Sequence, residues 1–327
     1  MRLKTIVFVV VGLFLLQSSV TFAGERKKKK SKEEKVEVKK ESAYDKLFKG
    51  QKCETVKGMI TIHKMDGKVY FEFPLNLLNK DMLLGSTITQ ITNNGFGSVG
   101  EKPYDPLHIT FVKRDSSMNL CAVNTNYTTK DENIGKRIEE STIPAVMQTF
   151  KIMAYNADST AVVFDVTDYF LSNEDNIGPF SPYAPILYRR RLEKEFKKQD
   201  SQITGIKAYA DNVSVESSLS YVVSVSDQRY YYIYKAPFNA VMTRSIILLP
   251  EEPMRPRYAD PRIGIFVGGR SEFTSDGSGI QPRYFANRWR LEPSDVEAYK
   301  RGELVEPVKP IVFYVDNAFP EEWKEPI

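Results

Sequence analysis

Apolar and polar residues alternate along most of the chain, and this alternation predicts β-strands. Met59–Met65 and Lys68–Pro74 alternate on either side of Asp66-Gly67, a pair that tolerates positive φ and so favours a tight hairpin. In the second of these strands we expect the apolar side chains on one face, and Tyr70 and Glu72 on the other.

The same pattern returns at short intervals, separated by turn residues. Further strands are predicted over 82–92, 107–113, 119–124, 147–155, 160–167, 203–209, 213–225, 229–234, 240–249, 263–267, 284–291 (as an extended segment) and 310–315. The last of these is expected to be a buried strand that begins a new domain. Many short strands of this kind predict a mainly β fold, an antiparallel sandwich or barrel-like sheet, with a few short helices.

Helices are predicted in only a few places. Short helices are expected over 75–81 and 168–171, a basic surface helix over 187–199, and a helix over 294–301 that starts at Ser294. Glu132–Glu140 is ambiguous, and the proline-rich residues 250–261 should form an extended connector.

The first 42 residues differ in composition from the rest. Residues 1–23 combine Arg2 and Lys4 with an apolar run from Ile6 to Leu16 and small residues near Ala23, which is typical of a signal peptide, with an uncleaved anchor as the alternative. Residues 24–42 carry nine Lys/Arg and five Glu; they predict a flexible charged tether, or a basic arm for an anionic surface. We therefore expect an exported protein: periplasmic, at the cell surface or secreted, with no transmembrane span after cleavage.

These two segments account for the basic excess of the chain. Residues 1–23 carry a net charge of +2 and residues 24–42 carry +4, whereas the whole chain is +4, so the remainder is near −2. A nearly neutral globule has no electrostatic footprint for nucleic acid.

Residue types that carry chemistry are scarce. His63 and His108 are the two histidines; neither belongs to an H-E-x-x-H motif, so no zinc ligands are predicted and a structural role is expected for each. Cys53 and Cys121 lack metal-site spacing, and they are either a disulfide or two separate thiols. No G-x-S-x-G elbow or phosphate-binding glycine loop occurs. No catalytic, metal or cofactor residue is predicted in this chain.

Two clusters suggest other interactions. Tyr230–Tyr234 holds four tyrosines, which predict either a strand buried on one face or a platform on which sugars stack. Arginines beside prolines and carboxylates suit either a clamp between domains or recognition of a substrate carboxylate. The residues predicted for such interdomain contacts are Arg257, Asp260, Arg262, Arg288, Trp289 and Arg290.

Several spaced motifs carry a resemblance to a known family. They are Tyr44–Leu47, Lys57–His63, Lys68–Pro74, Leu78–Leu83, Arg257 with Asp260–Gly264, Arg288–Leu291, and Lys309–Asp316 followed by Pro320 and Trp323. In this order they resemble the N-terminal region of large exported zinc-dependent metalloproteases of Gram-negative bacteria, whose front domains are of unknown function.

The resemblance implies a two-part front region that precedes a metzincin-like catalytic domain. It divides this chain into a small hairpin-containing domain (43–92), a larger β domain (93–305) and the start of a catalytic domain (306–327). That catalytic domain would carry H-E-x-x-H-x-x-G-x-x-H and bind zinc, and the motif is not in this sequence. The expected function is thus a non-catalytic support region that contacts a catalytic domain in cis or in trans; the alternative is a free-standing glycan- or protein-binding module.

Overall fold

The computed structural model describes residues 41–315 and 317–325. The predicted signal peptide and all but the last two residues of the predicted tether lie outside the described residues. Helices and 3-10 turns are few: α1 (Ala43–Phe48), α2 (Glu132–Ser141), α3 (Thr167–Phe170), α4 (Val296–Lys300), η1 (Leu75–Leu77), η2 (Asp175–Ile177), η3 (Pro185–Leu187), η4 (Lys198–Asp200) and η5 (Glu321–Trp323). No helix within the described ranges is long and apolar enough to cross a membrane.

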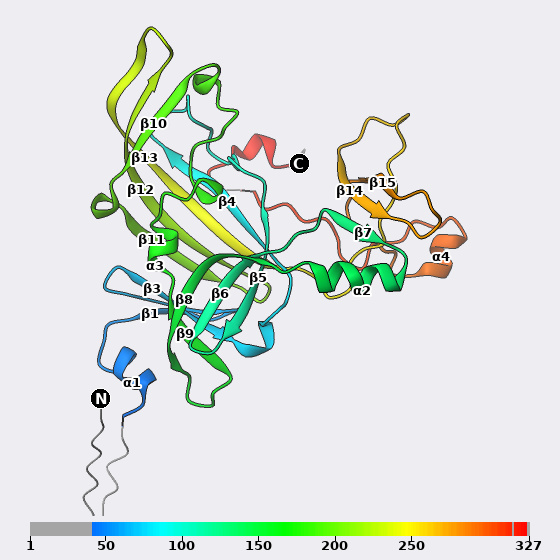
Figure 1. Cartoon of the computed structure of the whole chain (residues 1–327), viewed down its shortest axis with the longest axis horizontal. Helices are drawn as coiled ribbons and strands as arrows, with labels where there is room; N and C mark the ends of the chain where they lie inside the picture. The colour runs from blue at the N-terminus through cyan, green and yellow to red at the C-terminus, as the bar shows by residue number, and fades with distance from the viewer. Residues whose placement is uncertain (1–40, 316, 326–327) are drawn as a thin grey trace, which may run out of the picture. The chain divides into compact units, whose positions relative to one another are not determined.

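The strands confirm the predicted mainly antiparallel β fold (Figure 1). They are β1 (Glu54–Val56), β2 (Thr61–Met65), β3 (Lys68–Pro74), β4 (Met82–Ile91), β5 (Leu107–Arg114), β6 (Ser117–Ala122), β7 (Tyr127–Thr129), β8 (Ala145–Tyr155), β9 (Ala161–Asp165), β10 (Arg191–Phe196), β11 (Gln202–Ala208), β12 (Asn212–Ser226), β13 (Tyr231–Leu248), β14 (Val267–Phe273) and β15 (Ile280–Ala286). Twelve form one sheet, in the order β1-β2-β3-β9-β8-β6-β5-β4-β13-β12-β10, with β11 paired to β12. A second sheet holds β15, β14 and β7, which lie side by side.

The large sheet curls until its two ends nearly meet. Met59, just before β2, donates its backbone N–H to the carbonyl of Tyr209, just after β11, at 2.6 Å. Lys64 on β2 donates from Nζ to the carbonyl of Thr204 on β11 at 3.3 Å. Gly58 allows this approach, because a Cβ there would lie 2.4 Å from the Tyr209 carbonyl oxygen. The sheet is therefore barrel-like and almost closed, which leaves few edge groups unpaired.

Local hairpins follow the sequence predictions. Asp66 and Gly67 connect β2 and β3 with φ of 50° and 74°, the left-handed pair that a type I′ turn needs. Asp115, with φ of 40°, also lies in the turn between β5 and β6, where it is the one residue with positive φ. The two strands predicted over 229–234 and 240–249 are one strand, β13, which has a register shift and a positive φ at Lys235. The gap in the hydrophobic pattern therefore marks a β-bulge and not a strand end.

Aromatic rings fill the interior of the large sheet. Phe71 and Phe73 of β3, Phe111 of β5 and Phe164 of β9 are fully buried, with ring centroids 4.7–6.3 Å apart. Each buried ring of this size stabilises the fold by about 1.5–3 kcal/mol. The predicted division of β3 is confirmed, since Tyr70 and Glu72 face the other side, toward α1.

Residues 43–92 and 93–305 share the large sheet. β3 pairs with β9, and β4 pairs with both β5 and β13. The predicted boundary between residues 92 and 93 follows the end of β4, so strands on both sides of it belong to one hydrogen-bonded path.

Three further predicted elements differ from the structure. The basic helix over 187–199 is wrong, because β10 occupies Arg191–Phe196 and pairs with β12. Every second residue of β10 turns toward the core, and Leu192 and Phe196 pack there, a period of two that the abundance of Lys and Arg obscured. The short helix predicted over 75–81 is reduced to the single turn η1, and the strand predicted over 263–267 begins only at Val267.

The C-terminal predictions also change. The N-cap of α4 is Asp295 and not Ser294, because the Asp295 carboxylate accepts the Ala298 N–H at 2.9 Å. Residues 311–315 form no strand and are exposed. The predicted buried strand over 310–315 is therefore wrong: its apolar residues lack a neighbouring strand among the described residues.

Candidate functional site

Large apolar side chains are exposed throughout residues 258–323. Among the described residues of this segment, Ala298 is the one buried hydrophobic residue, whereas the core of the protein comes from residues before 250. The C-terminal apolar set comprises Ile263, Ile265, Phe266, Val267, Trp289, Leu291, Leu304, Val308, Ile311, Val312, Phe313, Tyr314, Val315 and Trp323. A soluble protein seldom leaves so many large apolar residues uncovered unless they form an interaction site.

Three exposed aromatic residues of this set, Phe266, Trp289 and Phe313, come from separate stretches of the chain. The exposed fractions are 88% for Phe266, 63% for Trp289 and 74% for Phe313. The Trp289 and Phe313 rings meet edge to face, with centroids 6.4 Å apart. The Phe266 carbonyl accepts the N–H of Asn287 at 3.0 Å, which holds Phe266 near Trp289 in space. Trp289 and Phe313 therefore form an aromatic pair, and Phe266 is attached to the same region through its backbone. Aromatic residues such as these are enriched at protein interfaces.

Arginines from two segments converge beside this region. Arg255, Pro256, Arg257 and Arg288 line a cavity of about 270 Å³. Arg288 donates from Nη2 to the Arg255 carbonyl at 2.8 Å. Of the predicted contact residues, the structure thus brings Arg257 and Arg288 together; the prediction missed Arg255, although it lies in the same Arg-Pro-Arg run.

The other predicted contact residues make local interactions. Arg262 forms a forked pair with Asp260, with Nε 2.9 and 3.1 Å from the two carboxylate oxygens. Arg290 donates to the Glu292 carboxylate and to the Glu252 carbonyl, both at 2.8 Å. The bond from Arg290 to Glu252 holds the proline-rich connector against residues 287–292. Exposed pairs of this kind contribute at most about 1 kcal/mol each.

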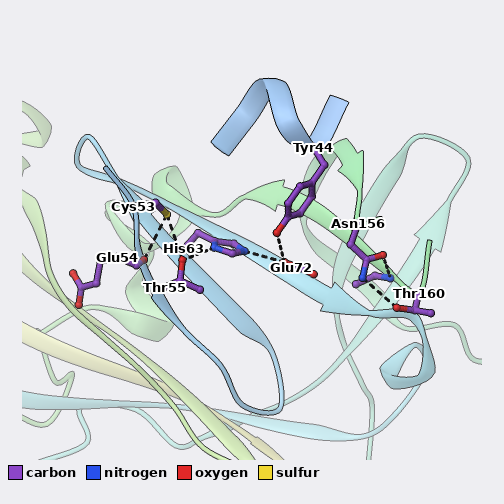
Figure 2. A network of polar contacts seen from close by, with 9 residues as sticks. Tyr44, Cys53, Glu54, Thr55, His63, Glu72, Asn156 and Thr160 are labelled. Atoms are coloured by element: carbon purple, nitrogen blue, oxygen red, sulfur yellow. Dashed lines mark hydrogen bonds and ion pairs between the residues drawn. The ribbon is translucent and has the colours of Figure 1, made fainter. Parts of the chain in front are cut away.

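A polar network surrounds His63 on the outer face of β1, β2 and β3 (Figure 2). Nε2 of His63 lies 2.9 Å from Glu72 Oε2, and Nδ1 lies 2.9 Å from the Thr55 hydroxyl. Tyr44 of α1 donates its hydroxyl to the same Glu72 oxygen at 2.9 Å. Phe48 of α1 covers the imidazole, with ring centroids 4.5 Å apart. Both ring nitrogens are occupied, so this arrangement attaches α1 to the sheet and supports a structural role for His63.

Burial and the neighbouring carboxylate affect the Tyr44 hydroxyl. Desolvation, and then the hydrogen bond to Glu72, raise the pKa of Tyr44 to about 12. The neutral phenol is therefore the form that the folded protein favours.

His108 lies on a different strand, β5, and contacts Asp81 at 2.8 Å. No group of three or more His, Cys, Asp and Glu side chains in the described part of the chain could hold a metal ion. Both cysteines are free thiols: Cys53 is half-buried beside Thr55, and Cys121 is buried on β6.

The tyrosine cluster is exposed. Tyr230, Tyr231, Tyr232 and Tyr234 are each about half exposed or more. Arg190 lies 3.7 Å above the ring of Tyr232, and the Tyr232 hydroxyl donates to Asp227 at 2.7 Å. The structure thus differs from the predicted strand buried on one face, and it leaves aromatic surface accessible to a ligand.

Sequence reasoning missed one buried charge, Arg244 of β13. Its side chain points into the barrel-like interior, where Nε donates to the Ile177 carbonyl at 3.1 Å and Nη1 to the Ser217 hydroxyl at 2.6 Å. Nη2 has no partner within the described ranges. Burial lowers the pKa of Arg244 to about 10. The sequence pattern could have predicted this burial, because Arg244 lies between Met242 and Ile246 on the inward-facing positions of an alternating strand.

A second charged cluster lies in the three-stranded sheet. Glu272 of β14 is buried between Arg283 of β15, with which it forms a close ion pair, and Lys130, whose Nζ is 3.7 Å away. The hydrogen bond from Arg283, and then the nearby positive charges, lower the pKa of Glu272. These three residues line a cavity of about 200 Å³. Lys130 directly follows β7, so the cluster connects the end of β7 with β14 and β15. The Glu272 carboxylate is already paired within the cluster, as a buried charge requires.

The fold and these surfaces define an antiparallel β protein with an uncovered apolar segment at its C-terminal end. Comparison with protein families shows that residues 101–294 match the domain of unknown function DUF5117, so the chain belongs to that family. Residues 41–91 match a second domain of unknown function, DUF5118. No curated protein and no solved structure matches the chain.

Proposed function

We propose that this chain is a non-catalytic support region of an exported zinc metalloprotease-like system. In this proposal its C-terminal apolar set packs against a metalloprotease-type catalytic domain, either in the same polypeptide or as a separate chain. The exposure of Phe266, Trp289 and Phe313 is the observation that carries the proposal. The resemblance of the spaced motifs supplies the identity of the partner.

The energetics favour a protein partner for these rings. Burial of an aromatic side chain of this size is worth about 1.5–3 kcal/mol, so three exposed rings leave several kcal/mol of apolar burial to a partner. Arg255, Arg257 and Arg288 lie next to the same segment and would supply the charged rim that typically surrounds an apolar interface centre.

Binding to an isolated catalytic domain tests the proposal. The probe is a purified zinc metalloprotease domain with the H-E-x-x-H-x-x-G-x-x-H motif, taken from a protein in which this type of front region precedes it. Isothermal titration calorimetry should detect binding, and a Phe266→Ser/Phe313→Ser double variant should weaken it at least tenfold.

Tyr183→Ser is the matched control, because Tyr183 is 90% exposed but lies outside the C-terminal apolar set. It should bind as the unmodified chain does. The proposal fails if the double variant binds as tightly as the control. It also fails if the chain alone binds zinc stoichiometrically and cleaves casein.

The tyrosine cluster supports a second candidate, a glycan-binding module. Tyr231 and Tyr234 meet edge to face at 4.9 Å and expose about half of their surface, an arrangement on which a sugar ring can stack. Calorimetry with soluble polysaccharides tests this candidate: tight binding that Tyr231→Ala abolishes would favour it over the support role.

A further inference from the structure

Three arginine residues line one cavity that no acidic residue lines. Arg255 and Arg257 of the proline-rich connector and Arg288, which follows β15, line this space together with Pro256. None of the three arginines forms an ion pair with any carboxylate among residues 41–315 and 317–325. The charged residues that line this cavity of about 270 Å³ are therefore all positive.

Neighbouring arginines of the same segment do have carboxylate partners. The pairs are Arg262 with Asp260, Arg283 with Glu272, Arg290 with Glu292 and Arg301 with Glu303. Four of the eight arginines of residues 255–301 are thus paired within the described part of the chain. The other four are Arg270 of β14 and the three residues that share the cavity.

The backbone holds two of these arginines in place. Arg288 donates from Nη2 to the Arg255 carbonyl at 2.8 Å, which orients its guanidinium plane. The Arg257 carbonyl accepts the N–H of Ala286 at 2.9 Å, which fixes the connector beside the end of β15. Pro256 restricts φ between Arg255 and Arg257. A site arranged in this way before binding loses less conformational entropy when it binds its ligand.

We propose that this cavity is an oxyanion-binding site for a tetrahedral dianion, a phosphate or sulfate group. Three like charges that share one space repel each other, and an anion between them converts this repulsion into attraction. A carboxylate would neutralise one of the three charges, whereas a dianion neutralises two. Guanidinium groups present paired N–H donors that match the oxygens of phosphate and related groups. The ligand is either the free anion or a phosphate monoester at the end of a larger molecule.

Calorimetry at constant ionic strength tests the site. Sodium sulfate and sodium phosphate are titrated into the full chain, with sodium acetate as the monoanion and sodium chloride as the ionic-strength control. Sulfate or phosphate should bind with a measurable Kd, and acetate at least tenfold more weakly. Phenyl phosphate, a monoester that is still a dianion above pH 7, then distinguishes the two sources: tenfold tighter binding than inorganic phosphate identifies an ester, and equal binding identifies the free anion.

Substitutions connect any binding to the cavity. Arg257→Gln should weaken sulfate binding at least tenfold. Arg288→Lys should weaken it by a smaller factor, because the charge stays and the fork is lost. Arg262→Gln is the matched control and should leave binding unchanged, since Arg262 is paired with Asp260 and does not line the cavity. The assignment is wrong if no dianion binds, if acetate binds as tightly as sulfate, or if Arg257→Gln and Arg262→Gln bind sulfate equally. These titrations contain no protein partner, so their failure leaves the proposed docking of a catalytic domain untouched.

Discussion

Gly58 lies where the two ends of the large sheet approach each other, and its substitution by alanine tests how closely they meet. The added Cβ would lie 2.4 Å from the Tyr209 carbonyl oxygen, 2.6 Å from the Tyr209 nitrogen and 2.8 Å from the Ala208 carbonyl carbon. All three are backbone atoms, so no side chain can rotate away. The contact is relieved only if β11 and the segment before β2 move apart.

The expected cost follows from two terms and one offset. Forced backbone shifts of this kind cost about 1–3 kcal/mol. Loss of the hydrogen bond from the Met59 N–H to the Tyr209 carbonyl, 2.6 Å in the structure, adds about 1 kcal/mol. The smaller conformational freedom of alanine in the unfolded chain returns about 0.4–1 kcal/mol. We therefore expect Gly58→Ala to lower the free energy of unfolding by about 1–3.6 kcal/mol.

Urea unfolding followed by intrinsic fluorescence measures this difference. Gly205→Ala is the control, because Gly205 lies on β11 and its added Cβ meets only Glu216, at an ordinary 3.6 Å. The control should stay within about 0.5 kcal/mol of the unmodified protein. If Gly58→Ala is as stable as Gly205→Ala, then the ends of the sheet do not approach as described.

Three further substitutions probe individual charges and hydrogen bonds. The pKa of Tyr44 is raised to about 12 in the folded protein, from 10. The stabilisation by the neutral Tyr44 hydroxyl is therefore complete below pH 10 and is lost as the pH rises through 12. Tyr44→Phe should remove this alkaline loss of stability in thermal unfolding scans. Arg283 lowers the pKa of Glu272 below 4.5. The stabilisation by the ionised Glu272 carboxylate is therefore present above pH 4.5 and is lost as the pH falls through the lowered pKa. Glu272→Gln should reduce this acid loss of stability in the same scans. Arg244→Ala should lower the free energy of unfolding by about 3–5 kcal/mol in urea titrations, since it leaves a cavity and removes the donor to the Ile177 carbonyl; a loss below 1 kcal/mol would contradict the buried position of Arg244.

Local features of the fold could be predicted from the sequence. The hairpin at Asp66-Gly67 depends on two residues that accept positive φ, and it forms where the pattern places it. The alternation in β3 likewise predicts which residues face the core. Features of this kind are determined by neighbours in the chain, so one sequence is sufficient to find them.

Long-range pairing could not be predicted in the same way. The contact of β3 with β9, and the approach of Met59 to Tyr209, join residues far apart in the chain. No local pattern encodes which strand becomes the neighbour of another. Prediction therefore reached the fold class but not the order of strands in the sheet.

Composition misled the prediction in two places. The many charges of Arg191–Phe196 suggested a solvated helix, whereas every second side chain of this strand turns toward the core. The apolar run from Ile311 to Val315 suggested a buried strand, whereas these residues are exposed. Hydrophobicity indicates that a segment gains free energy on burial, and it does not say that a partner for that burial lies within the same chain.

The candidate sites were predicted as residue types and not as arrangements. Arg257 and Arg288 were expected to make contacts, and they line one cavity; that Arg255 joins them there depends on the three-dimensional path of the connector. Asp260 and Arg262 pair with each other, and within the described ranges neither has another ion-pair partner. Residue chemistry identified the region, and only the structure separates the paired arginines from the unpaired ones.

Hydrogen exchange of the chain with and without the isolated zinc metalloprotease domain tests the support role most directly. Amides around Phe266, Trp289 and Phe313 should exchange at least tenfold more slowly when the catalytic domain is present, because binding would cover that segment. Unchanged exchange throughout residues 258–323 at saturating concentrations of the catalytic domain, or protection confined to Tyr230–Tyr234, would contradict it.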